Sequence, residues 1–288
     1  MYVENKFDKQ LPQQIIKTVS NKTYNKTLFS TFPLAIPTGI FISLTFIFYT
    51  TLFTNTEALP WAVNSLTSRV VISLGFFLII IVSDKLFTSS KLALIATASN
   101  RISITQMLKN WFVVSSNNFI GASFLVLLVF LAILYNGDDG QSGLTFLQVT
   151  QYKFHHNTTE IVALGILCNI MVCLTVWMAF EAKTGTDKIF SVQLLAAIFV
   201  ALGLAYCTAN MFMVPLGILI QHFAPAEFWI AIAQNPSTFA DISTSNFIFN
   251  NLIPVTIGNI IGGGVIVGLM YWIIYLRPIQ KIKQFYKL

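Results

Sequence analysis

Two interruptions in apolar segments carry residue types that could handle a small ion inside a membrane. The first, at residues 83–85, reads Ser-Asp-Lys and is followed by Thr-Ser-Ser at 88–90; the second, at 203–210, contains Thr208 and Asn210. Ser, Thr and Asn favour the position that precedes a helix. A helix N-terminus presents free N–H groups and the positive end of the helix dipole. Two such termini facing each other would favour an anion, and the alternative is a pair of kinks without function.

The composition shows what kind of chain surrounds these interruptions. Of 288 residues, 55% are hydrophobic and 10% are charged, against roughly 25% charged in a soluble domain. The mean hydropathy of +0.72 excludes a soluble globule, a disordered chain and a coiled coil. The net charge of +6 comes from basic residues beside apolar segments, so no nucleic-acid partner is expected. Cys168, Cys173 and Cys207 lie inside apolar segments, without disulfide or zinc spacing.

Six apolar segments have the length of membrane-spanning helices, about 20 residues each. They cover residues 31–53, 70–98, 111–135, 160–180, 189–220 and 247–276. The interruptions fall in the second and the fifth segment, the middle span of each set of three. With three spans each, the two halves have opposite orientations, and broken spans at corresponding positions indicate a transport site. We therefore expect an all-α membrane protein, with tails at 1–30 and 277–288 around a channel domain at 31–276.

Lysine and arginine predict the orientation in the membrane. The two tails, the loop between spans two and three and the loop between spans four and five hold 13 of them, whereas the opposite side holds Arg69 and Lys153. Positive residues favour the cytoplasmic side, so both termini are expected there. The first 30 residues are polar and carry five lysines, which does not fit a signal peptide.

Several stretches resemble one known family along residues 7–276. They read FTSS at 87–90, KNW at 109–111, HH at 155–156, LGIL-N at 164–169, MVCL-VWM at 171–178, ANMFM-P at 209–215 and NLIPVTIGNIIGGG at 251–264. In these motifs and their order the chain resembles the formate/nitrite transporters, most closely the bacterial formate channels. The resemblance implies an aquaporin-like six-helix protomer, a homopentamer in the bacterial inner membrane, and one pore per protomer for small monovalent anions. It implies no cofactor.

The same resemblance implies roles for particular residues. It puts Thr88 in the loop that breaks the second span. It puts Lys153, Asn169 and Asn259 near a central chamber. Rings of bulky apolar side chains gate by excluding water, and the resemblance implies two such constrictions, a cytoplasmic one formed by Leu86, Phe87 and Val172 and a periplasmic one formed by Ile72, Phe76 and Phe199. Composition alone, with 26 phenylalanines, would assign the phenylalanines to packing.

Two positions depart from the family pattern. Ala205 and Tyr206 stand where the family has Glu-His, and Lys85 stands where it has an acid. A free tyrosine has a pKa of about 10 and a histidine about 6.5, so Tyr206 is a worse proton donor by roughly 5 kcal/mol. Tyr206 still donates a hydrogen bond, and its phenol stays neutral between pH 5 and 8, so we expect anion flux to depend only weakly on pH. Lys85 either adds positive charge to the pore or extends to the cytoplasmic face.

Formate or a similar anion passing through a channel is the leading hypothesis. A nitrite or hydrosulfide channel, or a proton-coupled anion carrier on the same scaffold, is the alternative, with membrane lipid and further copies of the chain as partners. A membrane enzyme is disfavoured because G-x-S-x-G and H-E-x-x-H are missing. A further alternative is a structural membrane protein whose pore does not conduct, because Tyr206 and Lys85 depart from the family pattern.

Overall fold

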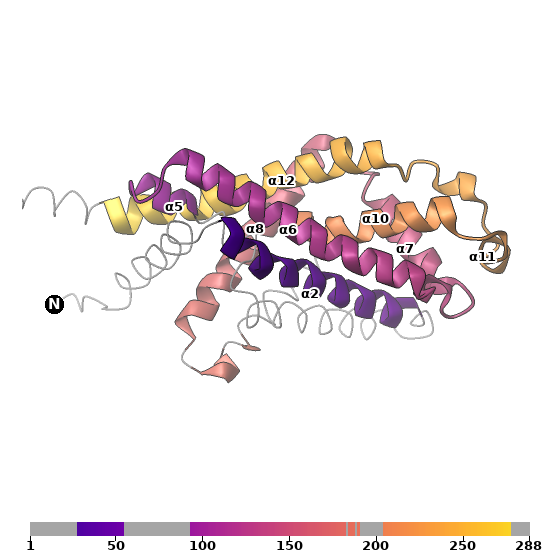
Figure 1. Ribbon diagram of the computed structural model, residues 1–288. Coiled ribbons are helices and arrows are strands. Elements are labelled where there is room, and N and C mark those ends of the chain that lie inside the picture. Colours follow the sequence, from indigo (N-terminus) through magenta and orange to yellow (C-terminus); the bar gives the residue numbers. More distant parts are fainter. Residues whose placement is uncertain (1–27, 55–92, 183, 188, 191–203, 278–288) are drawn as a thin grey trace, which may run out of the picture.

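The computed structural model describes residues 28–54, 93–182, 184–187, 189–190 and 204–277. These residues form helices joined by turns, arranged as an elongated bundle (Figure 1). The helices are α2 (Leu28–Thr54), α5 (Ala93–Ala98), α6 (Ile104–Leu131), α7 (Gln141–Tyr152), α8 (Thr158–Glu181), α10 (Cys207–Phe223) and α11 (Ala226–Ala231), with short turns η1 (Leu134–Asn136) and η2 (Pro236–Phe239). The last helix is continuous and is built from η3 (Asn246–Leu252), α12 (Ile253–Ile260), η4 (Ile261–Leu269) and η5 (Trp272–Leu276).

Three helices are long and apolar enough to cross a membrane. They cover Ile104–Leu131, Thr158–Met178 and Asn246–Ile274, and they match the third, fourth and sixth predicted spans. Helix α2 matches the first predicted span. The described part of the protein is therefore all helical and has the character of a membrane protein.

Helix α6 begins at Ile104, earlier than the predicted start at residue 111. Ser103 caps it: its Oγ accepts a hydrogen bond from Gln106 N (3.2 Å), and Gln106 Oε1 accepts one from Ser103 N (2.8 Å). This Ser-x-x-Gln capping box satisfies two free N–H groups at the helix start. Lys109, predicted to lie in a loop, is therefore inside α6.

Helix α7 was not predicted from the sequence. It has 12 residues and begins after Gly140, whose φ of 87° is favourable for glycine. Phe146 and Leu147 anchor it in a core formed with α10 and α11. Figure 1 shows α7 and α11 at one end of the bundle, with α5 and the C-terminal end of the last helix at the other.

Glycines let the first and third predicted spans touch through their backbones. A Cβ at Gly39 of α2 would lie 2.1 Å from Asn118 O, and one at Gly121 of α6 would lie 2.2 Å from Ile36 O. No side chain fits at such distances, so the two helices pack at the closest approach that glycine permits.

The fourth and sixth predicted spans, α8 and the last helix, are packed in the same way. A Cβ at Gly258 would lie 2.3 Å from Val162 O, and one at Gly262 would lie 2.2 Å from Ile166 O. The four-residue spacing of these two small residues therefore lets the helices approach closely. Figure 1 shows α2 and α6 running in one direction along the bundle and the last helix running in the other.

The second interruption is partly described. Residues 204–206 are not helical, and α10 begins at Cys207. The first interruption, at residues 83–85, lies outside the described residues, as do residues 191–203.

Candidate functional site

Asn259 holds the non-helical backbone that precedes α10. Its Nδ2 donates to Gly165 O (2.9 Å) on α8 and to Ala205 O (3.0 Å), and its Oδ1 accepts from Cys207 N (3.2 Å). The side chain is fully buried. A buried backbone group without a partner is costly, so one amide here stabilises an irregular turn that would otherwise lose hydrogen bonds. Asn259 thus fixes where α10 begins.

Tyr206 is the residue from which α10 starts. It occupies the N-cap position in an extended conformation, and its carbonyl accepts the first helical hydrogen bond from Asn210 N (3.1 Å). The residue is 1% exposed and packs in the core formed by α8, α10 and the last helix. The position that departs from the family pattern therefore lies at the helix N-terminus that the sequence singles out.

Asn169 of α8 presents a hydrogen-bond donor that the described protein groups do not use. Its Oδ1 accepts from Cys173 Sγ (3.6 Å), whereas its Nδ2 is buried without a partner. Gly263 makes room for it, because a Cβ there would lie 2.5 Å from the amide oxygen. Val172, one turn along α8, is buried in the same core. A buried N–H without an acceptor is a ready site for an anion or a polar ligand.

Lys153 brings positive charge to this region. It caps the C-terminus of α7, in the connection to α8 and outside the candidate membrane spans. The residue is partly exposed, but its amine is removed from water, and this desolvation lowers the pKa of Lys153 to about 8; the Cys168 side chain partly offsets the shift. Since this pKa stays above 7, the amine is mostly charged at neutral pH.

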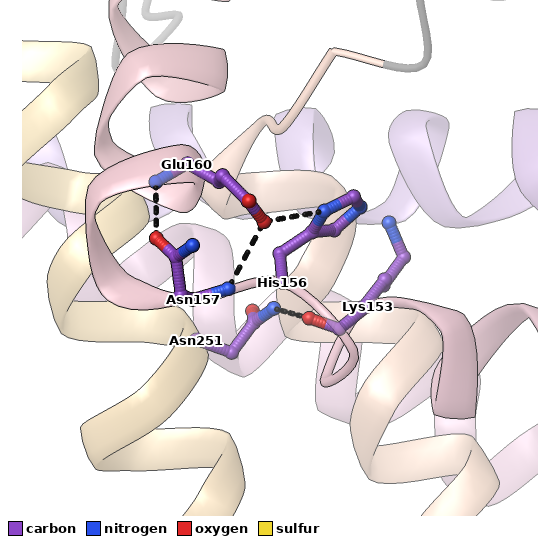
Figure 2. A network of polar contacts seen from close by, with 5 residues as sticks. All are labelled: Lys153, His156, Asn157, Glu160 and Asn251. Atoms are coloured by element: carbon purple, nitrogen blue, oxygen red, sulfur yellow. Dashed lines mark hydrogen bonds and ion pairs between the residues drawn. The ribbon is translucent and has the colours of Figure 1, made fainter.

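Two carboxylates, those of Glu160 (Figure 2) and Asp241, bind groups other than the Lys153 amine. Glu160 closes a capping box at the start of α8: its Oε2 accepts from Asn157 N (3.1 Å) and lies 3.3 Å from His156 Nδ1, while Asn157 Oδ1 accepts from Glu160 N (3.0 Å). Asp241 Oδ1 accepts from Gln151 Nε2 (2.9 Å). Within the described ranges, no carboxylate forms an ion pair with Lys153.

His155 and His156 lie in the turn between α7 and α8 rather than on a helix. His155 Nε2 lies 4.0 Å from Asp241 Oδ2, and His156 bonds Glu160. They therefore contact different acids. Among the described residues, no group of three or more His, Cys, Asp or Glu side chains could hold a metal ion.

Five predicted site residues are described: Tyr206, Lys153, Asn169, Asn259 and Val172. Tyr206, Asn259 and Val172 border one core around the start of α10, and Asn169 lies beside Val172 on α8. The remaining predicted residues lie outside the described residues, namely Thr88, Lys85, Leu86, Phe87, Ile72, Phe76 and Phe199.

Two buried amides complete the region. Asn251 was not singled out from the sequence. Asn210 was expected, with Thr208, to precede a helix, but the structure places both Thr208 and Asn210 inside α10, after the N-cap residue Tyr206. Asn210 Nδ2 donates to Asn251 Oδ1 (2.7 Å), and Asn251 Nδ2 donates to Lys153 O (3.4 Å). Both residues fall inside stretches that carry the family resemblance, at 209–215 and 251–264. That placement was the available signal, but it does not separate them from their neighbours.

Comparisons with known proteins agree with the family resemblance seen in the sequence. The family model described as formate/nitrite transporter matches residues 9–273. The formate channel FocA of Escherichia coli (strain K12) is 45% identical over 280 residues, which cover 96% of this chain and 98% of that protein. The formate channel FocB of the same organism is 35% identical, covering 94% of this chain and 97% of that protein. A solved structure described as a pentameric formate channel with formate bound has 44% identity and a TM-score of 0.82, covering 88% of this chain and 100% of that one.

Proposed function

The chain belongs to the formate/nitrite transporter family, and on that basis we propose that it forms a homopentameric channel in a bacterial inner membrane. Each protomer passes formate, or a similar small monovalent anion, through its own pore. The relatives at 35% to 45% identity are named formate channels, and the similar solved structure is pentameric and holds formate. These names describe channels rather than enzymes.

One observation carries the proposal. Lys153 holds an amine that is removed from water and has no carboxylate partner among the described residues. A buried charge without a partner is unfavourable, and a small anion supplies the missing one. Asn169 offers a buried Nδ2 without a partner, on the helix that carries Cys168, whose side chain acts on the Lys153 amine. A carboxylate such as formate has the acceptors that both groups lack.

We propose further that the channel domain, residues 31–276, consists of two inverted halves with a broken middle span in each. The matching glycine contacts of α2 with α6 and of α8 with the last helix support this arrangement. The start of α10 at Cys207, after three non-helical residues, supports a break in the fifth span. The positive charges support a cytoplasmic location for both tails, residues 1–30 and 277–288.

We propose that the pore has a central chamber near Lys153, Asn169 and Asn259 and that it narrows on both sides of this chamber. Leu86, Phe87 and Val172 form the cytoplasmic constriction, and Ile72, Phe76 and Phe199 form the periplasmic one. Val172 is buried in the core that contains Tyr206, which supports its place near the pore. Thr88 and Lys85 complete the polar lining from the second span.

An anion that passes through such a pore loses water molecules from its hydration shell and gains hydrogen bonds from protein donors. Lys153 attracts the anion, and the amide of Asn169 replaces part of its water. Tyr206 donates a hydrogen bond rather than a proton, because a phenol is a far weaker acid than an imidazolium ion. This substitution favours a channel over a proton-coupled carrier.

Flux into proteoliposomes tests the proposal. Vesicles that hold the purified protein receive formate, nitrite or hydrosulfide, with and without a pH gradient. The variant Lys153→Gln is measured in the same way, and empty vesicles are the control. We expect rapid formate uptake by the parent that needs no pH gradient, and slower uptake by the variant. Uptake no faster than in empty vesicles would overturn the proposal, and uptake that stops without a pH gradient would indicate a proton-coupled carrier.

A further inference from the structure

Asn251 lies where three elements of the protein meet. It belongs to η3 of the last helix and is 2% exposed. Its Oδ1 accepts from Asn210 Nδ2 of α10 (2.7 Å), and its Nδ2 donates to the carbonyl of Lys153 at the end of α7 (3.4 Å). One buried amide therefore ties the start of α10 to the connection that carries the buried amine.

The contact with Asn210 reaches Tyr206 in one further step. Asn210 N donates to Tyr206 O (3.1 Å), the first hydrogen bond of α10. The side-chain oxygen of Asn210 is buried without a partner, so its bond to Asn251 is what orients this amide. Through Asn210, Asn251 therefore supports the first turn of α10, and this turn fixes the position of Tyr206.

The contact with Lys153 fixes the other side. The last carbonyls of a helix lack partners within the helix, and Asn251 satisfies the one at the C-cap of α7. Figure 2 shows the Lys153 side chain extending away from this carbonyl, on the side of the His156 ring. A shift of this backbone therefore moves the amine with it.

The backbone around Asn251 is unusual. Residues Asn246–Leu252 form a π-helical stretch, which adds a residue to a helical turn and is frequent at functional sites. Within it Asn250 is exposed, and its Nδ2 donates along its own helix to Asn246 Oδ1 (2.8 Å). The neighbouring Asn251 points inward to α7 and α10. Asn251 therefore bonds groups of two other elements, whereas the adjacent Asn250 bonds a side chain of its own helix.

We propose that Asn251 is a positioning residue for anion passage, one that sets the spacing between the Lys153 amine and Tyr206. This inference rests on the proposed channel function. It names no new contact with the anion: Asn251 acts through the two groups that it holds. Its loss weakens the binding of formate in the chamber more than it weakens the fold, because α8, α10 and the last helix keep their own core.

Formate flux in proteoliposomes tests this with Asn251→Leu and the matched control Asn250→Leu. We expect Asn251→Leu to lower flux at sub-saturating formate about tenfold, mainly through a higher half-saturating concentration, since two buried groups lose their partner. Asn250→Leu should stay within twofold of the parent. Pentamer yield and the thermal midpoint, measured in the same detergent, separate positioning from loss of structure.

A double-mutant cycle with Lys153→Gln supplies the decisive readout. If Asn251 acts through Lys153, Asn251→Leu should cost less than threefold once the amine is gone, because coupled residues are non-additive. A full tenfold loss in the Lys153→Gln background would overturn the inference. A parent without formate flux would instead overturn the proposed function.

Asn251→Asp is the second variant, used if Asn251→Leu does not assemble. Its carboxylate still accepts from Asn210, but it no longer donates to the Lys153 carbonyl, so only one of the two links is cut. We expect a change in half-saturating formate that again disappears in the Lys153→Gln background. An unchanged half-saturating concentration in assembled Asn251→Asp would contradict a role through Lys153.

Discussion

The two proposed halves of the bundle bring their helices together through the same kind of glycine contact and then differ in one amide. In the first half, Gly39 and Gly121 bring α2 against α6; in the second, Gly258 and Gly262 bring α8 against the last helix. Each half also has an asparagine three residues before the contact glycine, Asn118 in N-F-I-G and Asn259 in N-I-I-G. The two helix pairs therefore share close glycine contacts and an asparagine three residues before one of the contact glycines.

The two asparagines are used differently. Asn259 makes three hydrogen bonds and holds the backbone at the start of α10. Asn118 is equally buried, yet neither its side-chain oxygen nor its nitrogen has a partner within the described ranges. Among the described residues, Asn118 therefore takes part in close helix packing only, whereas Asn259 also supports non-helical backbone.

The largest effects should come from the shared device. Gly121→Ala and Gly262→Ala each place a methyl group about 2.2 Å from a carbonyl oxygen, and overpacking of this kind costs about 3 kcal/mol. Both variants should lose most of the assembled protein, as measured by size-exclusion chromatography in mild detergent. Gly185→Ala, where nothing lies within 4 Å, is the control. Normal assembly of one glycine variant alone would show that the two crossings are not equivalent.

The next effect should separate the halves. Asn259→Ala leaves Gly165 O, Ala205 O and Cys207 N without their partner, which costs about 3 kcal/mol. Asn118→Ala removes no hydrogen bond to the part of the chain that the structure describes, and it should change stability by about 1 kcal/mol at most. Thermal unfolding of the two purified variants measures the difference. Equal losses in both would indicate that Asn118 also supports non-helical backbone.

A smaller effect concerns the charge of Lys153, in the connection between the two proposed halves. Since burial lowers the pKa of Lys153 to about 8, its amine is charged below this pH and loses its charge as the pH rises through it. Formate flux should therefore be level from pH 5 to 7 and fall several-fold between pH 7 and 9. In Lys153→Gln, flux should be lower throughout and show no such decline.

Neighbouring titratable groups provide the control for this pH profile. Cys168 lies close enough to act on the amine, and the His156 ring lies on the same side of the turn. Cys168→Ala and His156→Gln should both retain the decline above pH 7. A decline that persists in Lys153→Gln would assign it to another group.

The smallest effect is expected at Tyr206. Tyr206→Phe keeps the ring and removes one donor, worth about 0.5–1.5 kcal/mol for a neutral bond and up to about 3 to a charged partner, so flux should fall several-fold. Tyr206→His restores a group that titrates between pH 5 and 7 and should add a step to the profile there. A parent that already shows a sharp step near pH 6 would contradict the assignment of Tyr206.

Much of the scaffold was predictable from the sequence. Long apolar segments predict α2, α8 and the last helix directly, because length and hydropathy determine membrane spans. Helix α7 was missed because it is short and mixed in polarity, and it is held by contacts of Phe146 and Leu147 with distant segments. The early start of α6 was readable from the Ser103 capping box.

The site was predictable in its residues but not in their connections. The resemblance points to Asn259 and Lys153, yet only the structure shows that Asn259 bonds the backbone before α10 and that Asn251 joins Lys153 to Asn210. Such contacts link residues far apart in the chain, and no local pattern encodes them. The difference between Asn118 and Asn259 is hidden for the same reason, since both lie in the same short motif.

We propose that this protein is an anion-conducting pore and that its anion conduction depends on Lys153. Its most direct test is the reversal potential of the purified protein in a planar bilayer with a formate gradient. The account predicts a current that reverses near the equilibrium potential of formate, does not shift with an added pH gradient, and falls at least several-fold in Lys153→Gln. A reversal potential that follows the cation or the proton gradient, or a current unchanged in Lys153→Gln, would contradict it.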